Sequence, residues 1–69
     1  MIRINLAQEQ EAMKAELEQH GYKFVKKEGI RLYFECPDGD DEKGQVESKQ
    51  IVKATPHGSI LYFNVEIVK

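Results

Sequence analysis

The residues best suited to chemistry lie in an acidic run, CPDGDDE, that begins at the only cysteine of the chain. Counted from Asp38, acidic residues occupy positions 1, 3 and 5 of a calcium-loop pattern, where oxygen ligands are needed. The same pattern needs glycine at position 6 and glutamate at position 12, and the chain has Lys43 and Lys49 there. We therefore interpret the run as a turn followed by a helix, with Asp40 or Asp41 as the N-cap.

Other groups that could bind a metal or act as nucleophiles are scattered along the chain. Cys36, His20 and His57 have none of the paired spacings of a zinc site. Glu35 and Asp38 flank the cysteine, and their charge should raise the pKa of its thiol, which disfavours a nucleophile. The sequence has no glycine-rich phosphate loop and no serine elbow. We predict no catalytic residue, no metal and no cofactor, and a protein that is not an enzyme.

A basic segment offers the clearest candidate for binding. Lysine and arginine gather over residues 23–31, with Glu28 as the one acidic residue among them. On one face of the predicted sheet these cations would lie beside apolar and aromatic side chains. The candidate interaction face comprises Lys23, Val25, Lys27, Arg31, Tyr33, Ile60 and Tyr62.

Two interpretations of this face are open. Apolar and aromatic side chains on an exposed sheet can pair with a second copy or with another protein, and covering them contributes free energy comparable to the stability of a small domain. We rank first a non-enzymatic binding module that assembles through its sheet as a homodimer. The alternative is RNA or single-stranded nucleic acid, with bases on aromatic rings and phosphates on cations. That alternative depends on Lys23, Lys27, Arg31, Tyr33 and Tyr62.

The first half of the chain predicts a helix and then a hairpin. Residues 5–21 are rich in helix formers, with Asn5 as the expected N-cap and Gly21 as the closing residue. Residues 22–27 and 30–36 are rich in β-branched and aromatic side chains and flank a short turn. The buried face of the second strand is expected to hold Ile30, Leu32, Phe34 and Cys36.

The second half predicts a helix and a final strand. Residues 41–55 follow helical spacing and stop before Pro56, although a strand over residues 45–54 is the alternative. Residues 59–69 alternate as a strand, with apolar side chains on both faces. Residues 1–5 alternate too and would add a strand at the start.

These elements predict an α+β fold, in which a small antiparallel sheet of three or four strands carries two helices on one face. The order is αββαβ, or the ferredoxin-like βαββαβ if residues 1–5 form a strand. If residues 45–54 are extended, the alternative is one helix packed on a four-stranded β-meander.

Length and charge set the remaining expectations. The 69 residues fit a single domain, residues 1–69, and chains this short often need a partner for stability. The net charge of −2 gives no global attraction to nucleic acid or to an anionic membrane. No apolar run reaches the roughly 20 residues of a membrane helix, and the N-terminus lacks a secretory signal. We therefore expect a cytoplasmic protein without membrane contact.

Overall fold

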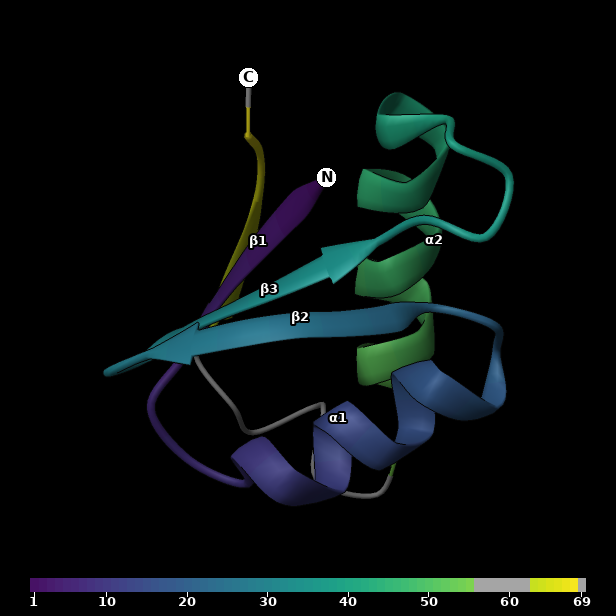
Figure 1. Cartoon of the computed structure of the whole chain (residues 1–69). Coiled ribbons are helices and arrows are strands. Elements are labelled where there is room, and N and C mark those ends of the chain that lie inside the picture. Colours follow the sequence, from purple (N-terminus) through teal and green to yellow (C-terminus); the bar gives the residue numbers. More distant parts are fainter. Residues whose placement is uncertain (56–62, 69) are drawn as a thin grey trace.

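The computed structural model describes residues 1–55 and 63–68, and residues 56–62 and 69 lie outside the description. The elements follow the order β-α-β-β-α-β (Figure 1). Their bounds are β1 Ile2–Leu6, α1 Gln10–Gln19, β2 Lys23–Glu28, β3 Arg31–Glu35, α2 Asp41–Ala54 and β4 Phe63–Ile67. The structure thus confirms a first strand at the N-terminus, and with it the longer of the two predicted orders.

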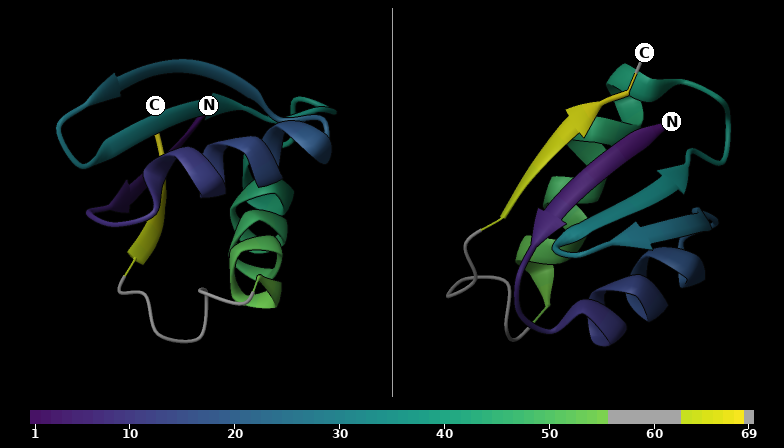
Figure 2. Two further views of the ribbon diagram at one scale, coloured as in Figure 1. Left: turned by 90° about the horizontal axis from the view of Figure 1, so that it is seen from below. Right: turned by 60° about the vertical axis from the view of Figure 1, so that its left-hand side comes forward.

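The four strands form one antiparallel sheet in the order β2-β3-β1-β4. The right-hand view of Figure 2 shows the strands side by side in this order, with α2 behind them. Both helices contribute to one core on that side of the sheet, which confirms the predicted α+β class. Residues 41–54 are helical, so the alternative of a single helix on a β-meander is wrong.

Strand β1 lies between β3 and β4 and shows a strict alternation of burial. Its residues Ile2, Ile4 and Leu6 are fully buried beneath the helices, whereas Arg3 and Asn5 lie on the opposite, open face. The core that surrounds them comprises Ile2, Ile4, Leu6, Met13, Leu17, Tyr22, Leu32, Phe34, Val52 and Val65. At about 1.5–3 kcal/mol per buried large apolar side chain, this cluster supplies the main stabilising term of the fold.

The first helix begins later than its composition suggests. Asn5 pairs with Arg31 and Asn64 inside the sheet, so the predicted N-cap at Asn5 is wrong. The apolar alternation of β1 extends through Leu6 and keeps Asn5 in a strand despite its capping propensity. Helix α1 starts at Gln10, after Glu9 in a left-handed conformation. Gly21, with φ of 89°, follows the helix as predicted.

The second strand of the hairpin, β3, departs from its predicted buried face at its first residue. Leu32 and Phe34 are buried as expected, but Ile30 belongs to the turn and is 52% exposed. Ile30 cannot reach the core because the chain reverses at Gly29, which has φ of 61°. The predicted face therefore starts two residues later, at Leu32.

Helix α2 packs through its small residues. Gly44, Ser48 and Val52 are its buried positions, in agreement with the predicted spacing. A Cβ atom built on Gly44 would lie 2.2 Å from Sγ of Cys36, so only glycine permits this close approach. The hydroxyl of Tyr22 lies 3.3 Å from the Gly44 carbonyl and donates to it. Cys36, which the sequence predicts to be buried, is half-buried and packs against the core at this point.

Among the described residues, no helix combines the length and the apolar character that a bilayer crossing requires.

We expect Gly44→Ala to lower the free energy of unfolding by about 1–3 kcal/mol, because the added methyl group overlaps the Cys36 sulfur. Helix propensity alone favours alanine over glycine by up to about 1 kcal/mol, so the two effects have opposite signs. Urea denaturation followed by circular dichroism measures the change. The exposed substitution Lys49→Ala should be nearly neutral, and Cys36→Ala should restore part of the loss in the double variant. A Gly44→Ala protein as stable as the wild type would contradict this packing.

Candidate interaction surface

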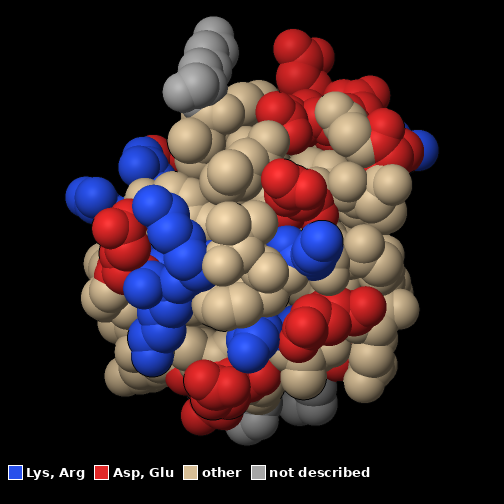
Figure 3. Space-filling model, in the orientation of Figure 1, with Lys and Arg blue, Asp and Glu red and all other residues tan. Residues whose placement is uncertain are grey.

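The open face of the sheet is a mixed-charge surface. In Figure 3, Lys and Arg gather over the strands on the left of the view, with Asp and Glu beside them. The strand register places the following side chains on the open face: Lys23, Lys26 and Glu28 from β2, Arg31, Tyr33 and Glu35 from β3, Arg3 and Asn5 from β1, and Asn64 and Glu66 from β4. Cations and carboxylates alternate across it, so the face has little net charge of either sign.

A hydrogen-bonded network joins β1 to β4 on this face. The Arg3 guanidinium donates to Glu66, which raises the pKa of Arg3 and lowers that of Glu66. The Asn5 amide donates to Asn64 Oδ1 at 2.5 Å and to Glu66 Oε1 at 2.9 Å. The two strands are therefore linked through side chains as well as through their backbones. Sequence reasoning missed this group because its members are about 60 residues apart.

Tyr33 is the aromatic residue at the centre of the open face, and it is covered. It is only 7% exposed, and the Lys26 ammonium lies 4.8 Å from the centre of its ring. A hydrogen bond from Tyr33, followed by the charge of Lys26, lowers the pKa of Glu28. The ring is thus held by its neighbours and offers little surface for stacking.

The structure distributes the candidate face residues over several places. Lys23, Arg31 and Tyr33 lie on the open face. A β-bulge between Phe24 and Lys26 shifts the alternation of β2. As a result, Lys26 lies opposite Tyr33 on the open face. Lys27 lies opposite Leu32, whose side chain points to the core. Val25 sits at the bulge and is 43% exposed. The remaining candidates, Ile60 and Tyr62, lie outside the described residues.

The two outer edges of the sheet differ. Strand β2 forms one edge, and its bulge and its three lysines among six residues are features that hinder pairing with another strand. Strand β4, with the sequence FNVEI, forms the other edge and has a regular register along β1. In the described part of the chain, one side chain reaches the outer backbone of β4: the Gln45 amide donates to the Val65 carbonyl at 2.8 Å. As far as residues 1–55 and 63–68 show, the β4 edge has neither the bulge nor the lysines found on β2.

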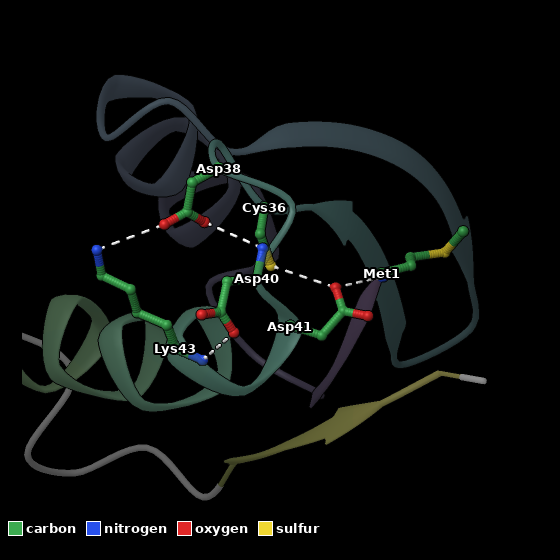
Figure 4. A network of polar contacts seen from close by, with 6 residues as sticks. All are labelled: Met1, Cys36, Asp38, Asp40, Asp41 and Lys43. Carbon is green, nitrogen blue, oxygen red and sulfur yellow. Dashed lines mark hydrogen bonds and ion pairs between the residues drawn. The ribbon is translucent and has the colours of Figure 1, made fainter.

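The acidic run forms a turn and a helix cap, as predicted. Asp40 accepts a hydrogen bond from the Lys43 backbone N–H at 3.1 Å and is the N-cap of α2. Asp38 accepts from the Asp40 N–H at 3.2 Å, and this bond, more than the nearby Lys43 ammonium, lowers the pKa of Asp38. Figure 4 shows these side chains at the start of α2. Within residues 1–55 and 63–68, no group of three potential metal ligands comes together.

Cys36 lies beside this cap. Its thiol is 3.8 Å from Oδ1 of Asp41, and the amino group of Met1 is 2.6 Å from the same oxygen (Figure 4). Burial and the negative charge of Asp41 raise the pKa of Cys36 to about 11. The thiol is therefore protonated at neutral pH, which agrees with the effect of acidic neighbours expected from the sequence and makes it a poor nucleophile.

A shallow groove runs between the helices, with a volume of about 280 Å³. It is lined by Glu16, His20, Glu47, Gln50, Ile51 and Ala54. In this groove Nε2 of His20, the C-cap of α1, lies 3.8 Å from Oε1 of Glu16, and both side chains are open to solvent. The other histidine of the chain, His57, lies outside the described residues.

Comparisons of this chain with protein-family models, with curated proteins and with solved structures found no match.

We expect the alkylation rate of Cys36 to keep rising as the pH approaches 11, because its pKa is raised to about 11 and only the thiolate reacts. Mass spectrometry after timed treatment with iodoacetamide measures the rate at each pH. The urea-unfolded protein serves as the control, and its rate should reach half of its maximum near pH 8.5, the ordinary pKa of a thiol. A folded protein whose rate levels off at or below pH 9 would show that burial and Asp41 do not act as described.

We expect Asp40→Ala to destabilise the protein by about 1 kcal/mol, because α2 then loses its N-cap hydrogen bond. Asp40→Asn is the matched control, since asparagine caps about as well as aspartate. Thermal unfolding by circular dichroism compares the two variants with the wild type. Equal losses in both variants would mean that the negative charge, and not the cap, is what matters at this position.

Proposed function

We propose that this chain is a non-enzymatic interaction module that assembles through its sheet as a homodimer. The observation that supports this most strongly is the unlike protection of the two sheet edges. Strand β2 carries a bulge and three lysines, whereas β4 presents a regular backbone edge. Unprotected edges are where sheets add strands, and soluble proteins usually block the edges that they do not use.

The size of the chain also favours assembly. A domain of 69 residues buries a limited core, and added contacts from a second copy contribute substantially to stability at this size. Strand β4 also carries two half-buried apolar side chains, Phe63 and Ile67, on the side of the sheet that faces the helices. A neighbouring strand would cover both.

Two features speak against the nucleic-acid alternative. The Tyr33 ring is nearly covered, with Lys26 over it, so it lacks the open aromatic surface on which bases stack. Two cations of the open face also have acidic partners, in the Arg3–Glu66 and Lys26–Glu28 pairs, which reduces attraction for phosphates.

The proposal further includes a non-catalytic role and a cytoplasmic location. The non-catalytic role is supported by the protonated state of the one cysteine, whose pKa is about 11. The cytoplasmic location is supported by the chain having a single cysteine, since secreted domains of this size are usually rich in paired cysteines.

We expect the purified protein to sediment as a dimer at micromolar concentrations and to dissociate on dilution. Analytical ultracentrifugation over a hundredfold concentration range measures the mass. The dimer should persist at high salt, because backbone hydrogen bonds and apolar contacts would hold it, whereas retention on single-stranded oligonucleotides would be lost. A monomer at several hundred micromolar would refute the assembly, and salt-sensitive binding to oligonucleotides by that monomer would favour the nucleic-acid alternative.

A further inference from the structure

The outer edge of β4 has a defined set of backbone groups. The Val68 N–H donates to the Met1 carbonyl at 3.0 Å, and antiparallel pairing alternates from residue to residue. Asn64 and Glu66 therefore bond to β1, whereas the intervening residues direct their N–H and C=O groups outward. These outward residues are Phe63, Val65 and Ile67.

The sequence of β4 is complementary to itself when two copies run antiparallel about Val65. In that register Phe63 lies opposite the partner's Ile67, and Val65 lies opposite the partner's Val65. These side chains all belong to the face that packs on the helices, so they extend the apolar layer from one copy to the next. The outward backbone groups then form about six hydrogen bonds between the copies.

The side chains of β4 on the open face are also complementary between the two copies in this register. Asn64 lies opposite the partner's Glu66, and the symmetry repeats the pair, so each carboxylate meets an amide. A register centred on Glu66 would instead place two carboxylates against each other, which is unfavourable. The arrangement of charge along β4 therefore favours the Val65-centred register over the Glu66-centred one.

We propose that β4 is the interaction surface, that its partner is β4 of a second copy paired antiparallel about Val65, and that the Gln45 side chain competes for the central bond. This inference rests on the proposed function, because it names the surface and the register of that assembly. Gln45 enters because its amide already donates to the Val65 carbonyl, which the central pair of the dimer would use. The two copies must displace or share that contact when they pair.

The charge of residue 64 tests the register. Asn64 is exposed and accepts a hydrogen bond from Asn5 of its own chain, and in the Val65-centred dimer it lies opposite the partner's Glu66. Asn64→Lys should tighten the dimer by about three- to tenfold, because two symmetric opposite-charge pairs form. Asn64→Glu should weaken it by a similar factor, because two carboxylate pairs form instead. Gln19→Lys and Gln19→Glu make the same charge changes at an exposed end of α1 and should leave the dissociation constant unchanged.

Sedimentation equilibrium gives the dissociation constants, and thermal unfolding checks that each variant is folded. Opposite effects of the two Asn64 variants, with no effect at Gln19, are the expected result. If the wild type and Asn64→Lys are both monomers at several hundred micromolar, the proposed function fails. If the wild type is a dimer but both Asn64 variants match it or change alike, the dimer uses another surface and this inference alone is wrong.

Gln45→Ala tests the competition separately. Loss of the amide frees the Val65 carbonyl, so the dissociation constant should fall by about threefold or more. Gln50→Ala removes the same side chain from an exposed position of α2 and is the control. An unchanged or weaker dimer in Gln45→Ala would refute the role of Gln45, while the Asn64 variants would still decide the register.

Discussion

Strand β1 pairs along both of its edges, and this pairing sets the orientation of every other strand. Its apolar residues Ile2, Ile4 and Leu6 are completely buried, so a shift by one residue would expose all three. Because β3 and β4 both align to β1, their alternation follows from it: Leu32, Phe34 and Val65 join the core on one side. The arrangement of the helices over that side follows in turn.

The same constraint explains why the open face and the edges have different characters. Residues between the buried positions of β1 face outward, and Arg3 and Asn5 there tie β1 to Glu66. These bonds satisfy polar groups within the chain and leave a face of mixed charge. An open sheet has two edge strands, which here are the bulged, lysine-rich β2 and the regular β4. Of these two ends, β4 is the better template for a further strand.

Much of the fold could be predicted because local signals and global packing agree. The alternation of Ile2 and Ile4 corresponds to strand β1. The cap at Asp40 corresponds to the start of α2, and the left-handed glycine Gly21 follows the end of α1. The errors arose where a local signal was overridden. Asn5 has the propensity of a cap but is held in the sheet, and Ile30 is apolar but lies in a turn.

The candidate site was less predictable, because its features depend on contacts between distant residues. A bulge shifts β2 by one position, so Lys26 rather than Lys27 lies over Tyr33. No residue type in that segment predicts the bulge. The contact of Gln45 with Val65 joins a helix to a strand 20 residues away. Alternation indicates which face a side chain occupies, but the identity of the edge strands requires the strand order.

The central claim, that β4 pairs with its own copy, is tested most directly by amide hydrogen exchange along this strand at two protein concentrations. In a monomer, the N–H groups of Asn64 and Glu66 are bonded to β1 and exchange slowly, while that of Val65 exchanges fast. We expect Val65 and its outward neighbours Phe63 and Ile67 to become protected as concentration rises, with Asn64 and Glu66 little changed. Fast exchange at Val65 in a sample that sediments as a dimer would contradict the account.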